Sequence, residues 1–151
     1  MKKVAIGCDH GGFVLKERVA ATLKRLGAEV VDLGCYDQNS VDYPEYGKKV
    51  AVEVASGRCD LGVVMCGTGI GISIAANKVR GIRAAVVTNT YMAKLTKNHN
   101  NANIIALGGR VITPDEAEAI VEAWYTAEYE GGRHQRRLDM ITAIEEENRN
   151  D

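Results

Sequence analysis

The sequence predicts one doubly wound α/β domain, a three-layer αβα sandwich around a five-stranded parallel sheet, with an extra helix at the C-terminus. Three observations lead to this fold class. Five short β-branched runs alternate with helical stretches along the chain. The runs are apolar on consecutive residues, as in strands buried on both faces. The 151 residues contain no repeat and no low-complexity segment, which fits one domain over residues 1–151.

The expected strands share this apolar composition and occupy residues 3–8, 29–34, 61–66, 83–88 and 103–108. The expected helices occupy residues 13–26, 43–56, 72–78, 91–98, 114–129 and 133–148. The first helix is predicted from its apolar stripe, which includes Leu15, Val19 and Leu23, and Gly27 ends it. Pro44 suits the first turn of the second helix, and Thr113 followed by Pro114 is typical of a capped helix start.

Charge and hydropathy exclude several classes of protein. The chain has 19 basic and 20 acidic residues, which gives no case for a nucleic-acid or membrane-surface protein. Its N-terminus turns polar too early for a signal peptide, and no apolar run approaches the roughly 18 residues of a membrane span. The four cysteines lack C-x-x-C spacing and paired histidines, so we expect reduced thiols, no metal and a cytoplasmic location.

A glycine-rich turn follows the third expected strand. Glycines 67, 69 and 71 allow a sharp bend and expose successive amides at a helix N-terminus, which together form an anion hole. The spacing differs from the G-x-G-x-x-G of dinucleotide sites, and the next strand ends without an acidic residue for a ribose hydroxyl. A tight turn without any ligand is the alternative.

Several side chains near the strand ends are candidates for chemistry. Cys66 lies where the helix dipole favours a thiolate, so it can be a base, a nucleophile or an inert buried residue. His10 and His99 lie in polar turns, where a capping role is the alternative. Arg133 and Arg137 are four residues apart and can bind one phosphate together, although the spacing alone favours a solvated basic turn.

Polar clusters end the first, third and fifth strands, and one more, at residues 97–101, lies just before the fifth strand. Ligands of doubly wound sheets bind beyond the carboxyl ends of the strands. We therefore expect all of these clusters to converge on that edge.

Four separated segments resemble the ribose-5-phosphate isomerase B family, in order and over essentially the whole chain. They are residues 7–12, 42–44, 66–78 and 129–134. The wider family includes galactose-6-phosphate and allose-6-phosphate isomerases. The resemblance implies a flavodoxin-like or Rossmann-like sandwich and a homodimer, or a tetramer, with sites between subunits. It also implies interconversion of ribose 5-phosphate and ribulose 5-phosphate, a reaction of the pentose phosphate pathway, without metal or cofactor.

The resemblance also implies residue roles. Cys66 is the base that moves a proton between C1 and C2, His99 opens the furanose ring, and Thr68 orients a hydroxyl. The enediolate oxygen is held by the backbone of Gly67, Gly69, Ile70 and Gly71. Sugar hydroxyls meet Asp9 and Asn100, and the phosphate meets His10, Arg110, Arg133 and Arg137. One branch of the family has a glutamate base in the following helix; residues 71–73 contain no acid, which leaves Cys66.

These parts supply what aldose–ketose exchange needs: a base, a sink for the enediolate charge, a ring-opening group and a phosphate clamp. A six-carbon aldose or aldose phosphate is the alternative substrate. A non-catalytic phosphosugar or nucleotide sensor and a nicotinamide-linked oxidoreductase are the alternatives from other classes.

Overall fold

The computed structural model describes residues 1–149, so the last two positions of the predicted domain lie outside the described residues. Its five strands form one parallel sheet in the order β2-β1-β3-β5-β4. The strands are β1 (Lys3–Cys8), β2 (Glu29–Asp32), β3 (Leu61–Cys66), β4 (Ala84–Val86) and β5 (Ile104–Gly108). The predicted doubly wound sheet is confirmed, with the last two strands exchanged relative to the flavodoxin order.

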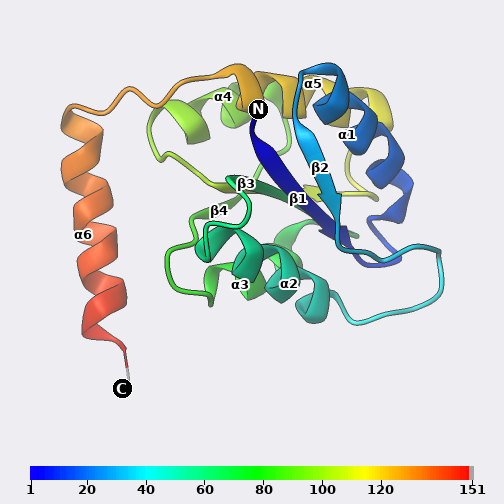
Figure 1. The fold of residues 1–151 in the computed structure, drawn as a ribbon, viewed down its shortest axis with the longest axis horizontal. Helices are drawn as coiled ribbons and strands as arrows, with labels where there is room; N and C mark the ends of the chain where they lie inside the picture. Colours follow the sequence, from blue (N-terminus) through cyan, green and yellow to red (C-terminus); the bar gives the residue numbers. More distant parts are fainter. Residues whose placement is uncertain (150–151) are drawn as a thin grey trace.

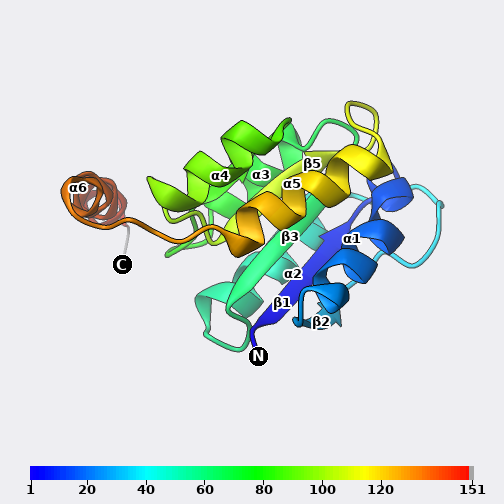
Figure 2. The same cartoon turned by 90° about the horizontal axis from the view of Figure 1, so that it is seen from above.

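Helices cover both faces of the sheet (Figures 1 and 2). They are α1 (Phe13–Arg25), α2 (Tyr43–Ala55), α3 (Ile70–Asn77), α4 (Thr90–Asn98), α5 (Pro114–Thr126) and α6 (Arg133–Glu147). Buried residues of α1, α4 and α5 share one apolar cluster with one face of the sheet, and those of α2 and α3 share the second cluster with the other face. Packing in these two clusters holds the strands in position, and the positions of the strands determine where the turns between strands and helices lie.

The fifth helix is shorter than predicted. It begins as expected, with Thr113 and Glu116 forming a reciprocal capping box. It ends at Thr126 rather than at residue 129, because the following backbone bonds to the end of α4 instead. The Asn98 side chain donates to the Glu128 carbonyl at 2.6 Å, and the Glu130 amide donates to the Asn98 carbonyl at 3.0 Å.

The last helix stands apart from the sandwich at the end of an extended segment (Figure 1). Only His134 and Leu138 of α6 are buried. Leu138 and Ile141 line a cavity of about 280 Å³ together with residues of β4 and α4. Glu145 accepts from the Gly81 amide at 3.1 Å, which attaches the far end of the helix to the loop before β4.

Candidate active site

The strongest candidate site lies at the carboxyl edge of the sheet, where β3 ends at Cys66. Cys66 is 5 % exposed, and its Sγ accepts a hydrogen bond from the Gly69 amide at 3.1 Å. Gly69 precedes α3 and has a φ of 83°, a left-handed conformation that favours glycine. The thiol therefore sits within the turn that begins a helix, where amide donors and the helix dipole stabilise negative charge.

Close packing explains why this turn is rich in glycine. A Cβ on Gly67 would lie 2.6 Å from a guanidinium nitrogen of Arg110, and one on Gly69 would lie 3.0 Å from the Leu107 backbone. The turn is held to the end of β5, because the Arg110 amide donates to the Gly67 carbonyl at 2.9 Å. Arg110 is exposed and lies directly over the glycine turn. A cation thus lies beside the first glycine of the turn that holds Cys66.

Thr68 is exposed at the tip of this turn. Its Oγ1 accepts from the Ile70 amide at 3.1 Å. Because that bond uses the oxygen as an acceptor, the hydroxyl proton is left to donate to a ligand. Ile70 is 55 % exposed, and its amide is already engaged by Thr68 in the absence of a ligand.

The turn after β1 packs against the glycine turn. A Cβ on Gly11 would lie 2.9 Å from the Gly67 amide nitrogen. Asp9 is buried, and its Oδ1 accepts from the Gly11 and Gly12 amides at 2.8 and 3.1 Å. One carboxylate oxygen of Asp9 therefore shapes the turn, and the second is able to accept from a ligand.

His10 is half-buried beside these turns and joins them to the loop before α2. Its Nδ1 accepts from the Val41 amide at 3.2 Å. With Nδ1 as an acceptor, the neutral ring carries its proton on Nε2. His10 can therefore donate from Nε2 to a phosphate oxygen.

Cys8 is a second cysteine at this edge; it ends β1 and is fully buried. Burial, reinforced by the neighbouring Cys35 thiol at 3.8 Å, raises the pKa of Cys8 to about 12. Cys8 therefore stays protonated and is a poor base, whereas Cys66 accepts an amide hydrogen bond and is the candidate base.

Tyr43 is a residue of this edge that the predicted site omitted. Its ring lies against Gly71, since a Cβ there would be 2.7 Å from ring carbons and 3.0 Å from the hydroxyl oxygen. The signal was present, because Tyr43 belongs to one of the four matching segments. Residues 43 and 71 are distant in the sequence, and only the packing of α2 against α3 brings Tyr43 to the turn.

The expectation that residues 97–101 join this edge is wrong for a single chain. Helix α4 returns across the sheet after β4, so His99 and Asn100 follow its C-terminal end. The next residues lie at the amino edge, where the Asn103 carbonyl accepts from the Gly62 amide at 2.9 Å. Gly62 and Cys66 are four residues apart on β3, about 13 Å along the strand.

His99 lies instead beside the start of α6. Its ring stacks on that of His134, with centroids 4.2 Å apart and an interplanar angle of 15°. Glu130 lies close to both rings: its Oε1 is 3.9 Å from the His99 Nε2 and 3.4 Å from the His134 Nε2. Glu130 and His134 belong to a matching segment but were not among the predicted site residues. Arg133 and Arg137 are exposed on the same helix.

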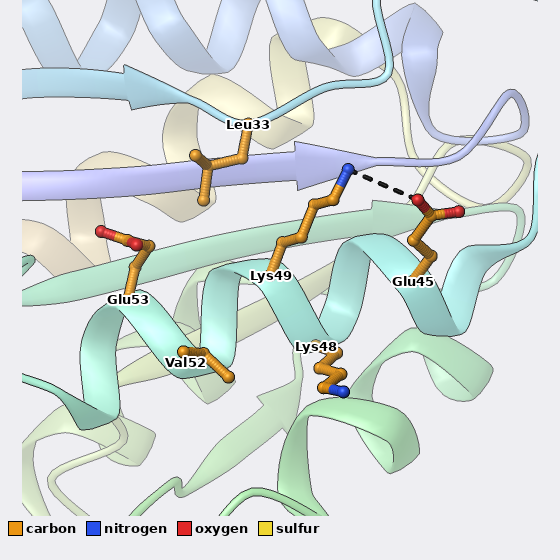
Figure 3. Close-up of a pocket in the computed structure, with 6 residues that line it drawn as sticks. All are labelled: Leu33, Glu45, Lys48, Lys49, Val52 and Glu53. Atoms are coloured by element: carbon orange, nitrogen blue, oxygen red, sulfur yellow. Dashed lines mark ion pairs between the residues drawn. The ribbon is translucent and has the colours of Figure 1, made fainter.

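The predicted residues thus divide into two half-sites. The Cys66 half-site at the carboxyl edge contains Asp9, His10, Arg110, Thr68 and residues 66–71. The His99 half-site at the amino edge and on α6 contains His99, Asn100, Arg133 and Arg137. A separate surface pocket along α2 is lined by Leu33, Glu45, Lys48, Lys49, Val52 and Glu53 and includes none of these residues (Figure 3).

Within residues 1–149, no helix combines the length and the apolar character that a membrane crossing requires.

A family model described as Ribose/Galactose Isomerase matches residues 4–141. The chain is 52% identical to ribose-5-phosphate isomerase B of Escherichia coli over 146 residues, which cover 97% of this chain and 98% of that protein.

Solved structures agree with this match. The fold is similar to that of ribose-5-phosphate isomerase B from Clostridium thermocellum, with a TM-score of 0.95, 56% identity and coverage of 97% of this chain and 99% of the other. It is also similar to ribose-5-phosphate isomerase B from Mycoplasma genitalium with bound ribulose 5-phosphate, with a TM-score of 0.91, 42% identity and coverage of 97% of both chains.

Proposed function

Since this chain belongs to the ribose/galactose isomerase family, we propose that it is an aldose–ketose isomerase that interconverts ribose 5-phosphate and ribulose 5-phosphate. The observation that carries the proposal is the bond from the Gly69 amide to the Cys66 Sγ at 3.1 Å. It places an ionisable sulfur beside a row of amides at a helix start. A base and an oxyanion site thus occupy the same turn.

The reaction moves one proton between neighbouring carbons. The Cys66 thiolate removes the C2 proton of the open-chain aldose, and the electron pair moves to the carbonyl oxygen to give a cis-enediolate. The amides from Gly67 to Gly71 and the Thr68 hydroxyl hold the negative oxygens. The O2 proton then moves to O1, the Cys66 thiol returns a proton to C1 as the C2 carbonyl forms, and the ketose results. His99 moves a proton between the ring oxygen and the C1 hydroxyl when the furanose opens.

The phosphate group lies at the far end of the sugar from C1 and C2. When the protein binds it, C1 and C2 are oriented relative to Cys66, so the entropy of orientation is lost on binding and not during proton transfer. His10 and Arg110 lie at the carboxyl edge, beside the glycine turn. Arg133 and Arg137 share one exposed face of α6 and add two further guanidinium groups. These four side chains form the proposed phosphate clamp.

We propose that the working unit is a homodimer in which each site combines the Cys66 half-site of one subunit with the His99 half-site of the other. The separation of the two half-sites within one chain supports this. A two-fold axis would form two such sites at once. Exposed apolar side chains on α3 and α6, namely Ile70, Ile74, Met140, Ile141 and Ile144, offer the surface for the contact. A tetramer would be two such dimers.

The experiment that tests this function is isomerisation of ribose 5-phosphate in deuterium oxide. An isomerase transfers its proton through an exchangeable thiol, so deuterium should appear at C1 of the ribulose 5-phosphate and at C2 of recovered substrate. Binding of ribose 5-phosphate without turnover or label would instead identify a phosphosugar sensor. A requirement for a nicotinamide cofactor would identify an oxidoreductase.

A six-carbon aldose or its phosphate is the second candidate substrate, because the matching family includes both ribose and galactose isomerases. The loop from Cys35 to Asp42, whose Val41 amide donates to His10, is the segment we propose to set this preference. Values of kcat/KM for ribose, allose and galactose phosphates decide between five and six carbons.

We also propose a cytoplasmic location, which the four free thiols support.

A further inference from the structure

Three metal-ligating atoms meet where α4, the extended segment and α6 come together. The His99 Nε2, the Glu130 Oε1 and the His134 Nε2 all lie within 4.8 Å of one another. The carboxylate oxygen is 3.9 Å from the first nitrogen and 3.4 Å from the second. None of the three side chains forms another ion pair within residues 1–149, so the three ligand atoms gather in one small volume.

The spacing matches a small divalent ion. Zinc takes nitrogen and oxygen ligands at about 2.0–2.1 Å in a tetrahedron, which puts neighbouring ligand atoms about 3.4 Å apart. The Glu130–His134 pair already has this separation. The His99 ring must leave its stack on His134, because the in-plane lone pairs of two rings 4.2 Å apart and 15° from parallel do not meet at one ion.

The backbone holds these ligands in place before any ion arrives. Asn98, the residue before His99, donates to the Glu128 carbonyl at 2.6 Å and accepts from the Glu130 amide at 3.0 Å. His134 is 6 % exposed, so its ring is fixed by packing. The Glu130 and His99 side chains are 54 % and 36 % exposed, which leaves one side open for an ion to enter and for a fourth ligand.

We propose that His99, Glu130 and His134 form a binding site for a divalent transition-metal ion, Zn²⁺ in the first instance, with three protein ligands and one open position. The donor set of two histidines and one glutamate is a common zinc set. The ion is an inhibitor rather than a cofactor. It occupies the His99 nitrogen lone pair, and on the proposed function that lone pair is needed to open the sugar ring.

Zinc binding to the intact protein can be measured without any assay of activity. Competition with a chromogenic chelator should give about one Zn²⁺ per chain, with Mg²⁺ as a non-competing ion because it prefers oxygen ligands. In nitrogen-detected NMR, the ring signals of His99 and His134 should shift on titration with Zn²⁺ while those of His10 stay in place. This measurement needs no variant, so it does not depend on how a variant folds.

Substitutions then locate the ion. Glu130→Gln and His134→Gln should each weaken zinc binding at least tenfold. Glu128→Gln is the matched control, because it removes an exposed carboxylate from the same segment while the backbone contact to Asn98 stays. His10→Gln and Cys66→Ser should bind like the parent. Unchanged affinity in Glu130→Gln and His134→Gln, or loss of binding in Cys66→Ser, would overturn the proposal.

The effect on turnover separates this inference from the proposed function. Zinc should slow the reaction of ribose 5-phosphate but spare a four-carbon aldose 4-phosphate, which cannot close a furanose ring because its C4 oxygen carries the phosphate. Equal inhibition of both substrates would contradict the assigned mode of inhibition. If the metal-free protein isomerises neither sugar, the proposed function fails while the chelator and NMR results still decide the metal site.

Discussion

Cys66 and His99 of one chain lie at opposite edges of the same parallel sheet. Cys66 ends β3 at the carboxyl edge, and His99 follows α4, which has crossed back to the amino edge. Each residue has its own local support, an amide turn for the thiol and the His134–Glu130 pair for the imidazole. The chemistry proposed for the two residues therefore requires more than one copy of the chain.

Replacing Cys66 with alanine should reduce kcat by at least about 100-fold, because it removes the base that moves the proton. Solvent deuterium should no longer appear in product or recovered substrate. Cys59→Ala, which removes a buried thiol remote from the edge, should keep normal turnover. Full activity of Cys66→Ala would eliminate the thiol as the base.

His99→Asn should slow isomerisation of ribose 5-phosphate far more than that of a four-carbon aldose 4-phosphate. Only the five-carbon sugar exists as a furanose that must first open. The comparison of kcat for the two sugars in parent and variant measures this selectivity. A proportional loss with both would mean that His99 has another role, such as holding the enediolate.

Co-expression of Cys66→Ala and His99→Asn chains should restore activity that neither variant has alone. In a mixed dimer, the His99→Asn chain supplies an intact thiol and the Cys66→Ala chain an intact imidazole, so one of two sites is complete. Random pairing then gives about one quarter of the parent activity. No recovery in purified mixed dimers would show that each site is built within one chain.

The double variant Arg133→Ala/Arg137→Ala should raise KM for ribose 5-phosphate by about 100-fold or more, since each charge-assisted bond contributes about 1.5–3 kcal/mol. An unphosphorylated aldose should lose little. Arg136→Ala, an exposed neighbour on the same helix, serves as the control. Equal losses with both kinds of sugar would argue against a phosphate clamp.

Lys97 should make stability depend on pH in the alkaline range. Burial, followed by the charge of Lys2, lowers the pKa of Lys97 from 10.5 to about 8 in the folded protein. As pH falls from 10.5 to 8, the unfolded chain binds a proton at Lys97 while the folded protein does not, so the free energy of unfolding decreases. This loss of stability reaches its full size below pH 8. The loss of stability is absent above pH 10.5, the pKa of Lys97 in the unfolded chain.

The variant Lys97→Met removes this titration. Between pH 7 and pH 11, the free energy of unfolding of the parent should rise relative to the variant by about 3 kcal/mol, since one pKa unit corresponds to about 1.4 kcal/mol. Urea unfolding at several pH values measures the difference. The contact of the charged amine with the Trp124 ring, 4.9 Å from its centroid, favours the parent at the acidic end and reduces the change. A difference independent of pH would contradict the lowered pKa.

Local signals in the sequence predicted most of the fold. Consecutive apolar residues at 61–66 gave β3 at its observed bounds, and the Thr113–Pro114 start gave the first turn of α5. The end of α5 was misplaced, because the bonds between Asn98 and residues 128–130 join segments 30 residues apart. No pattern along the chain reports such a bond.

The same division holds for the site. The glycine turn, the thiol before it and the charged residues of α6 follow from residue types and spacing, because a turn and a helix start are set by neighbours in sequence. Which edge of the sheet each residue reaches depends on how α4 crosses the sheet, and Tyr43 meets Gly71 only through packing of α2 on α3. Proximity in space comes from the folded chain, and that is why the two half-sites emerged only from the tertiary structure.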